Sequence, residues 1–336
     1  MTDTPQGALD ELATHARRGF PQLLAARDRT ERDLDDLRRR LRDGPCDPGS
    51  SVVMMGSWGR RERTNGSDDD YLVLVDGERP GEGAPPVEPQ VPRLETLLGR
   101  GEAKPGTQGI FGQQVFVGPM VRHIGLEEDG NANLTQRMLL LLESVPVVGR
   151  EAYRRSLEQV VDGYLAGEAK DYRPPRFLLN DLIRYWRTIC VDFAGKARAD
   201  DQKWGMRNAK LRLNRKLLFA GGLIPVLHCH LHLRDEQRAF LLDALQAPPT
   251  DRLAHAFLRH DAIDEGVRAL GAYDRWLGML DDPESRAHLT GLTREAAADD
   301  AVFRDVRRLA QEFERGLIAL LFETGLSPLA REFVLF

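Results

Sequence analysis

The sequence predicts an α+β protein in which a small mixed sheet with flanking helices precedes an all-helical region. Two short apolar runs, residues 52–55 and 71–75, have the length and β-branched content of buried strands. From about residue 150 onward, apolar residues instead recur at helical spacing between Pro, Gly and Asp signals. We therefore expect two domains, residues 1–148 with the sheet and its N-terminal helices, and residues 149–336 as a helical bundle.

The composition is that of a globular chain with an ample core. The 336 residues are 42% hydrophobic and 29% charged. A net charge of −5 predicts no general affinity for nucleic acid, so any such affinity needs a local basic patch. No apolar run approaches the roughly 20 residues that span a membrane, and residues 1–12 lack the apolar core of a signal peptide. The three cysteines have no motif spacing, so we expect a cytoplasmic protein without a membrane partner.

Periodicity and turn residues predict the remaining elements. Before the first strand, residues 8–42 have two helical stretches separated at Pro21. After the second strand, residues 77–92 are rich in Pro and Gly, which is typical of a plain surface loop or of an active-site cover. The expected elements that follow are a short helix at 90–100, a third strand at 108–121, a core helix at 131–142 stopped by Pro146, and helices at 153–165, 177–193, 204–220, 235–245, 251–259, 262–280 and 301–324.

The segment between the two strands carries the candidate chemistry. Gly56 and Ser57 end the first strand, and Asp68, Asp69 and Asp70 open the second. Because side chains at i and i+2 of a strand share a face, Asp68 and Asp70 point one way and Asp69 another. Gly56 lets the backbone approach a phosphate closely, and Ser57 can donate to a phosphate oxygen. A surface hairpin with acidic turn residues is the simpler interpretation, but buried strands, Gly-Ser, a spacer and Asp-x-Asp together favour a site for a nucleotide and its metal.

This motif resembles that of the DNA polymerase β-type nucleotidyltransferase superfamily, whose signature is Gly-Ser, a spacer and Asp-x-Asp on the next strand. Residues 56–62, GSWGRRE, are most similar to the Gly-x-x-Gly-Arg-x-Glu turn of the branch with the PII-protein uridylyltransferases. The resemblance implies a nucleotidyltransferase fold for the first domain and transfer of a nucleoside monophosphate from an NTP. It implies Mg²⁺ or Mn²⁺ held by Asp68 and Asp70, and contacts of Gly56, Ser57 and Ser67 with the nucleotide. Arg60 is expected either to contact phosphate or to act as a structural pin for Glu62.

One feature departs from that superfamily, in which many members carry a third carboxylate on a later strand. Residues 103–126 contain no Asp or Glu. The first candidates are Glu127, Glu128 and Asp129, of which Asp129 is our expected third metal ligand. An acidic loop before a helix also has an ordinary explanation, since carboxylates favour the N-terminal end of the helix dipole.

Two predicted helices of the second half carry basic side chains on one side. We expect these side chains to bind the triphosphate, because Arg offers a bidentate fork and Lys a point charge. Solvation, or ion pairs with Asp181, Asp192 and Asp200, would equally account for them. We expect the aromatic residues Tyr185, Trp186 and Trp204 to belong to the core. The candidate nucleotide-binding residues here are Arg184, Arg187, Lys203, Arg207 and Lys210, with Asn214 continuing the second stripe.

The segment with His228, Cys229, His230 and His232 allows a zinc site, but packed or surface histidines are favoured because no second ligand pair lies nearby in sequence. The acceptor of the predicted transfer stays open between a protein, a tRNA or oligonucleotide, a second nucleotide and a small molecule. A protein of another class, a catalytically degenerate nucleotide sensor or scaffold on the same fold, is the second hypothesis.

Overall fold

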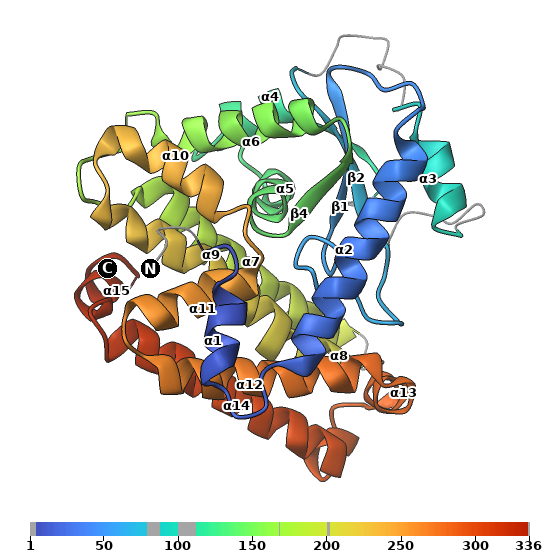
Figure 1. Cartoon of the computed structure of the whole chain (residues 1–336), viewed down its shortest axis with the longest axis vertical. Coiled ribbons are helices and arrows are strands. Elements are labelled where there is room, and N and C mark those ends of the chain that lie inside the picture. The colour runs from blue at the N-terminus through green and yellow to red at the C-terminus, as the bar shows by residue number, and fades with distance from the viewer. Residues whose placement is uncertain (1–4, 79–87, 100–111, 168, 200–201, 335–336) are drawn as a thin grey trace. The chain divides into compact units, whose positions relative to one another are not determined.

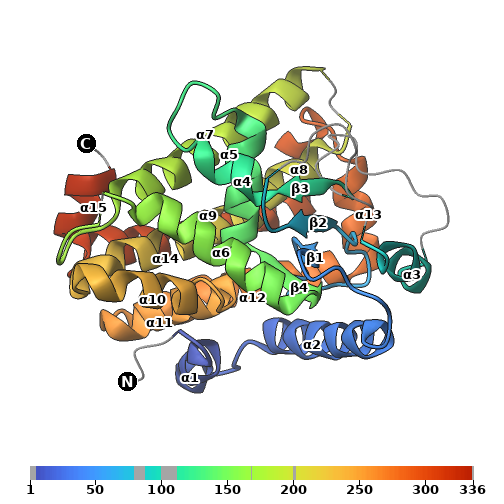
Figure 2. The same ribbon diagram turned by 90° about the horizontal axis from the view of Figure 1, so that it is seen from above.

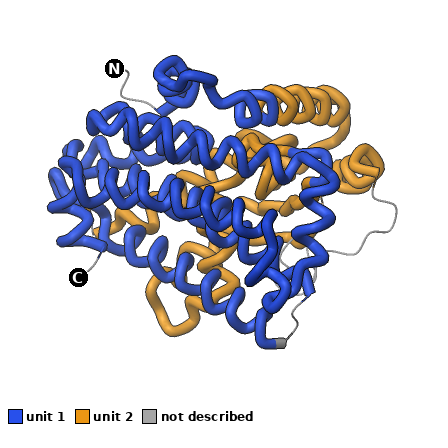
Figure 3. Tube along the Cα trace, turned by 90° about the horizontal axis from the view of Figure 1, so that it is seen from below, with its two compact units in different colours: residues 1–26, 64–66, 170–336 blue, residues 27–63, 67–169 orange. Residues whose placement is uncertain are grey.

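The computed structural model describes residues 5–78, 88–99, 112–167, 169–199 and 202–334 (Figure 1). Contacts divide the chain into two compact units (Figure 3). The sheet unit comprises residues 27–63 and 67–169, and the helical unit comprises residues 1–26, 64–66 and 170–336. The two units are defined by their internal contacts, which do not show whether either folds by itself. The expected domain boundary between residues 148 and 149 therefore stays a prediction.

A four-stranded mixed sheet forms the centre of the sheet unit. Its strands are β1 (Ser50–Met55), β2 (Tyr71–Val75), β3 (Gln114–Phe116) and β4 (Ser144–Val148), in the order β3-β2-β1-β4. β1 pairs antiparallel with both β2 and β4, whereas β2 pairs parallel with β3. The α+β class with a small mixed sheet is therefore confirmed.

The apolar strands are buried because helices cover them. Val52 and Met54 of β1 belong to one core cluster with Leu34, Leu37 and Leu41 of α2 (Pro21–Leu41). Helix α3 (Val91–Leu97) contributes to this cluster, and α5 (Asn131–Leu142) and α6 (Arg150–Leu165) lie on the other side of the strands (Figures 1 and 2). Because side chains alternate along a strand, those of β1 face the helices on both sides of the sheet.

Two expectations for the sheet unit were wrong. The third strand was expected over residues 108–121, but β3 has three residues and Val117–Arg122 forms helix α4; residues 108–111 lie outside the described part. Pro146 was expected to stop the core helix, but α5 already ends at Leu142 and Pro146 lies within β4. β4 is an edge strand, where a proline removes no hydrogen bond that the sheet needs. Most of the loop at 77–92, residues 79–87, also lies outside the described residues.

The helical unit confirms the helical pattern of the second half and extends it. Helices α13 and α15 were not expected, although Asp282 caps α13 through Ser285 N and Pro283 follows at its first turn. Pro225 lies inside α9, which continues to His228. The helices of this unit are α1 (Ala8–His15), α7 (Arg176–Ala199), α8 (Trp204–Lys210), α9 (Lys216–His228), α10 (Arg234–Ala244), α11 (Pro249–Arg259), α12 (Ile263–Asp281), α13 (Pro283–Gly291), α14 (Ala301–Phe322) and α15 (Ser327–Val334).

Carboxylates of the later helices hold the N-terminal segment of the helical unit. Asp251 of α11 accepts a hydrogen bond from Gly7 N at the start of α1, and Asp274 of α12 accepts one from Leu23 N in the first turn of α2. Each supplies a partner for a helix N-terminal N–H group that has none within its own helix. No helix in the described part of the chain is long and apolar enough to cross a membrane.

Candidate functional site

The turn that follows β1 brings the Gly-Ser pair next to the aspartates that precede β2. Met55 N donates to the carbonyl of Asp70 at 2.8 Å, which extends the β1–β2 pairing by one step. Gly56 has φ +63°, a left-handed conformation that favours glycine. A Cβ built on Gly56 would lie 3.6 Å from Asp70 Oδ2, so this carboxylate lies against the turn. Ser57 and Ser67 are half-buried at the two ends of the same loop.

The three consecutive aspartates have different environments. Asp69 Oδ1 accepts a hydrogen bond from the indole Nε1 of Trp58 at 2.9 Å and lies 3.4 Å from Arg63. Arg63 also stacks on the Trp58 ring, with Cζ 3.9 Å from its centroid. Asp69 therefore stabilises the loop, whereas Asp68 is exposed and Asp70 is half-buried beside Gly56. The three aspartates precede β2, so the expectation that Asp68 and Asp70 share one face stays a prediction.

Arg60 has a structural environment. Its Nε donates to Glu62 Oε2 at 3.0 Å, and its Nη1 pairs with Glu143 at the end of α5. Glu62 and Glu143 are only 2% and 1% exposed. Of the two expected roles, these contacts favour the structural pin, because the guanidinium already neutralises buried carboxylates.

A close approach at Gly59 fixes the same turn. A Cβ at this position would lie 1.9 Å from the backbone oxygen of Glu143, so no larger residue fits without a backbone shift. Within the turn, Arg60 N donates to Gly56 O and Glu62 N donates to Ser57 O, at 2.9 and 2.8 Å. The start of β4 and the turn after β1 are thereby held together. Glu143 could not be found from the sequence, since its partner Arg60 lies 83 residues away and no local pattern links them.

Asp129 is not placed to bind a metal, which corrects our expectation. Its Oδ1 and Oδ2 accept from Arg137 Nη1 and Nη2, each at 2.7 Å, and both side chains are fully buried. Arg137 also donates to Met120 O and to the Tyr164 hydroxyl, each at 2.8 Å. The bidentate pair occupies both carboxylate oxygens of Asp129. Among the described residues, no group of three or more His, Cys, Asp or Glu side chains is placed to hold a metal ion.

The sheet does not place any other candidate for a third carboxylate beside Asp68 and Asp70. Glu127 and Glu128 are exposed in the loop before α5. β3, which pairs with β2, carries Gln114 opposite Val73 and has no carboxylate. Among the described residues of the sheet unit, the candidate metal-binding carboxylates near the Gly-Ser turn are therefore Asp68 and Asp70.

The basic candidates all lie in the helical unit. Arg184 is 3.5 Å from Asp181, and Arg187 is exposed on the same helix. Lys203 is exposed immediately before α8, while Arg207 and Lys210 on that helix are half-buried. These contacts do not test whether the five basic side chains bind a nucleotide, so that role stays a prediction.

The predicted stripe was wrong at Asn214. A π-helical turn, Leu211–Arg215, joins α8 to α9 and changes the register after Lys210. Asn214 is buried, where Oδ1 accepts from Trp276 Nε1 at 2.9 Å and Nδ2 donates to the Tyr273 hydroxyl at 2.8 Å. The spacing assumed a regular helix, and one extra residue in a turn moved this side chain into the core.

The aromatic candidates pack within the helical unit, as expected. Tyr185 is buried, and Trp186 stacks on Phe219 with ring centroids 5.5 Å apart. Trp204 lies between Phe193 and Phe303, at 6.4 and 5.3 Å.

The histidine-rich segment forms divergent contacts. His228 Nε2 lies 2.9 Å from His260 Nε2, His230 bonds to Leu227 O, and His232 stacks on Phe240. Burial lowers the pKa of His228 and, with the nearby Arg259 charge, lowers the pKa of His260 to about 4. Burial also raises the pKa of the Cys229 thiol. These contacts support packed histidines and not a zinc site.

Comparisons of the chain with protein-family models, with curated proteins and with solved structures return no match.

Proposed function

We propose that this protein is a metal-dependent nucleotidyltransferase that moves a nucleoside monophosphate from an NTP to an acceptor. The observation that carries the proposal is the left-handed Gly56 turn, with Asp70 against it and Asp68 two residues earlier. An open glycine turn next to a pair of carboxylates matches the needs of a triphosphate and its cation.

The donor set fits a hard divalent cation. Mg²⁺ is commonly bound by one or two carboxylates together with substrate phosphates, so Asp68 and Asp70 would hold Mg²⁺ or Mn²⁺. Such an ion would neutralise charge on the pyrophosphate that leaves. Gly56, Ser57 and Ser67 would contact the phosphates through backbone N–H and hydroxyl groups. The Arg60–Glu62–Glu143 cluster would keep the turn in place.

The reaction forms one P–O bond and breaks another. An acceptor oxygen attacks the α-phosphorus, the bond to the β-phosphate oxygen breaks, and pyrophosphate leaves while the acceptor proton passes to solvent. The acceptor remains a protein, a tRNA or oligonucleotide, a nucleotide or a small molecule. Three cysteines without motif spacing support a reducing, cytoplasmic setting for this reaction.

Pyrophosphate release tests the proposal. The purified chain is incubated with each labelled NTP and Mg²⁺ or Mn²⁺, with and without cell extract, and the labelled product identifies the acceptor. Asp68→Asn and Asp70→Asn should each abolish release while the circular dichroism spectrum stays unchanged. Asp36→Asn removes an exposed carboxylate of α2 that pairs with Arg39 and Arg40, and it should leave the rate unchanged. Undiminished release in the Asp68→Asn, Asp70→Asn double variant would overturn the mechanism.

A nucleotide sensor or scaffold on the same fold is the second candidate. The bidentate Arg137–Asp129 pair and the carboxylate-free β3 favour it, because they leave Asp68 and Asp70 without a third carboxylate from these elements. Saturable NTP binding without pyrophosphate release for any NTP, metal or extract would support the sensor.

A further inference from the structure

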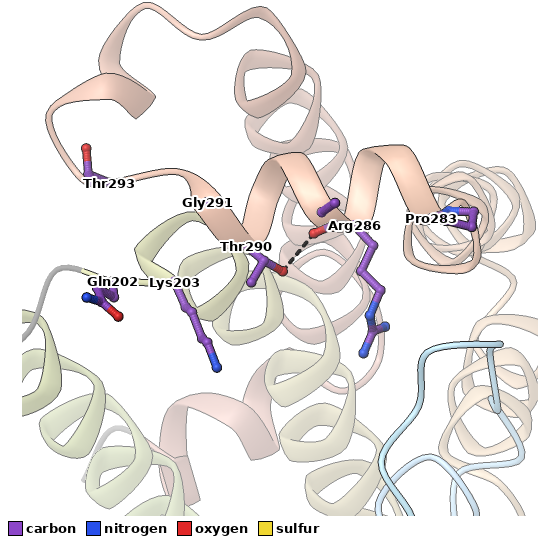
Figure 4. Close-up of a pocket in the computed structure, with 8 residues that line it drawn as sticks. Gln202, Lys203, Pro283, Arg286, Thr290, Gly291 and Thr293 are labelled. Carbon is purple, nitrogen blue, oxygen red and sulfur yellow. Dashed lines mark hydrogen bonds between the residues drawn. The ribbon is translucent and has the colours of Figure 1, made fainter.

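A hollow of about 720 Å³ opens in the helical unit between the residues before α8 and helix α13 (Figure 4). Its volume lies within the range of small-molecule pockets, about 300–1,000 Å³. Lys203 lines it from one side, and Pro283, Arg286, Ala287 and Thr290 line it from α13.

The hollow carries positive charge. Lys203 and Arg286 extend in the same direction from neighbouring elements, with Thr290 between their bases (Figure 4). All its other described lining residues are uncharged. Lys203 Nζ has no hydrogen-bond or ion-pair partner among the described residues. Two cations without a described counter-ion at this site favour an anion between them.

The guanidinium of Arg286 is oriented but not neutralised. One Nη donates to the backbone carbonyl of Gly66, which clusters with the helical unit. A Cβ on Gly66 would lie 2.5 Å from Arg286 Nε, so the side chain packs directly on this glycine. A carbonyl carries no charge, so the full positive charge of Arg286 remains available to a ligand.

Backbone contacts fix the two segments that carry these cations. Gly205 N donates to Leu292 O at 2.9 Å, and a Cβ at Gly205 would lie 2.9 Å from Leu289 O, so α8 begins in close contact with the end of α13. Lys203 has φ +59°, which costs a non-glycine residue on the order of 1 kcal/mol or more. Thr290 donates its hydroxyl proton to Arg286 O at 2.7 Å, which leaves the oxygen as an acceptor. A preorganised site loses less entropy when it binds a ligand.

We propose that this hollow binds a small molecule through a phosphate or diphosphate group, with Arg286 as the forked donor and Lys203 as the point charge. Arg and Lys together suit a multiply charged phosphate better than a single carboxylate. Pro283 and Ala287 provide an apolar wall for the body of the ligand, and the Thr290 oxygen can accept from a ligand hydroxyl. The proposal concerns the helical unit alone and does not rest on nucleotidyl transfer.

Calorimetric titration of the full chain with inorganic pyrophosphate, in buffer with EDTA, tests the proposal. Saturable binding is expected, and it should weaken as sodium chloride is raised. Lys203→Gln and Arg286→Gln should each weaken binding about tenfold or more, since a hydrogen bond to a charged group contributes roughly 1.5–3 kcal/mol. Arg286→Lys keeps the charge but loses the fork, so it should give a smaller loss. Separate titrations with ribose 5-phosphate and AMP show whether a sugar or a base adds affinity.

Matched controls make the outcome decisive. Arg308→Gln removes an exposed cation of the same unit, one that pairs with Asp305 and Glu312, and should leave binding unchanged. Asp68→Asn should also leave metal-free binding intact, so failure of the transferase and failure of this site are distinguishable. The absence of saturable binding for all three probes would overturn the proposal. Equal affinity in Lys203→Gln, Arg286→Gln and the parent would do so as well.

Discussion

The sheet unit and the helical unit hold their polar interiors in different ways. In the sheet unit, buried charges pair with one another, as Arg137 does with Asp129 and Arg60 with Glu62 and Glu143. In the helical unit, some buried contacts are neutral, as between Asn214, Tyr273 and Trp276, or between the lowered-pKa rings of His228 and His260. Buried charges of that unit also bond to backbone groups, as Asp251 does to Gly7 N and Asp274 to Leu23 N. The two units therefore differ in the partners of these buried groups, which are opposite charges in the sheet unit and neutral groups in the helical unit.

This difference has a mechanical consequence. A buried ion pair costs desolvation on both sides, but it has a narrow geometry that a neutral network lacks. In the sheet unit that geometry fixes the turn after β1, where Gly56 and Asp70 lie together. Removing one member leaves an uncompensated charge, whereas removing a neutral partner leaves an unsatisfied dipole. The two units should therefore differ in how strongly a single substitution lowers their stability.

The largest effect is expected at Arg137. Arg137→Ala leaves Asp129 fully buried without its bidentate partner and should lower the free energy of unfolding by about 3–5 kcal/mol. Urea denaturation followed by circular dichroism measures this loss. Asp129→Asn is the reciprocal test, because it keeps the shape of the side chain but leaves the buried charge of Arg137 without its carboxylate. A loss below about 1 kcal/mol for Arg137→Ala would contradict the assignment of this pair as a main support of the sheet unit.

A somewhat smaller loss is expected at Glu143. Glu143→Gln removes one of the two carboxylates that meet Arg60 and should cost about 2–4 kcal/mol, since Arg60 keeps Glu62 as a partner. Arg60→Gln should cost at least as much, because it removes the contacts with both Glu62 and Glu143, and the two losses should not add in the double variant, because both substitutions remove the Arg60–Glu143 contact. Additive losses in urea denaturation would show that Arg60 and Glu143 act independently.

The contrast between the units also explains which features the sequence could predict. The Gly56 turn and the two strands on either side of it follow from glycine's backbone freedom and from short apolar runs, both of which are local. Helix α5 was predicted with its observed bounds, because its leucines recur regularly and nothing interrupts them.

Features that depend on distant partners were not predictable. Asp129 looked like an open acidic ligand, but Arg137 reaches it from the next helix and occupies both oxygens. Asn214 looked like part of a basic stripe until one π-helical turn shifted it into the core. The pocket cation Arg286 had no sequence signal, because its significance depends on Lys203, 83 residues earlier in the chain.

A moderate loss is expected in the helical unit at Asn214. Asn214→Ala removes the buried acceptor of the Trp276 Nε1–H and the hydrogen bond to the Tyr273 hydroxyl, and it should cost about 1–3 kcal/mol. Asn208→Ala, on the preceding helix, should cost less, because Asn208 accepts from Arg212, an exposed side chain that can bond to solvent instead. Thermal unfolding of both variants measures the two losses of stability. A loss for Asn208→Ala as large as that for Asn214→Ala would contradict this ranking.

The smallest effect is expected from acid, and it also belongs to the helical unit. Burial and the charge of Arg259 lower the pKa of His260 to about 4, against roughly 6.5 in an unfolded chain. As pH falls from about 6.5 to about 4, the unfolded chain therefore binds a proton that the folded chain does not. Stability that is fully present above pH 6.5 is lost over that window, and burial lowers the pKa of His228 in the same direction.

Melting temperatures between pH 7 and pH 4.5 measure this loss. Because His260 is half-buried, solvent screening reduces the effect below that of a fully buried group. His260→Gln removes the titrating ring and should flatten the dependence, whereas His15→Gln, at an exposed position of α1, should leave the parent slope unchanged. If His260→Gln and His15→Gln keep the same slope, carboxylates elsewhere set the acid sensitivity.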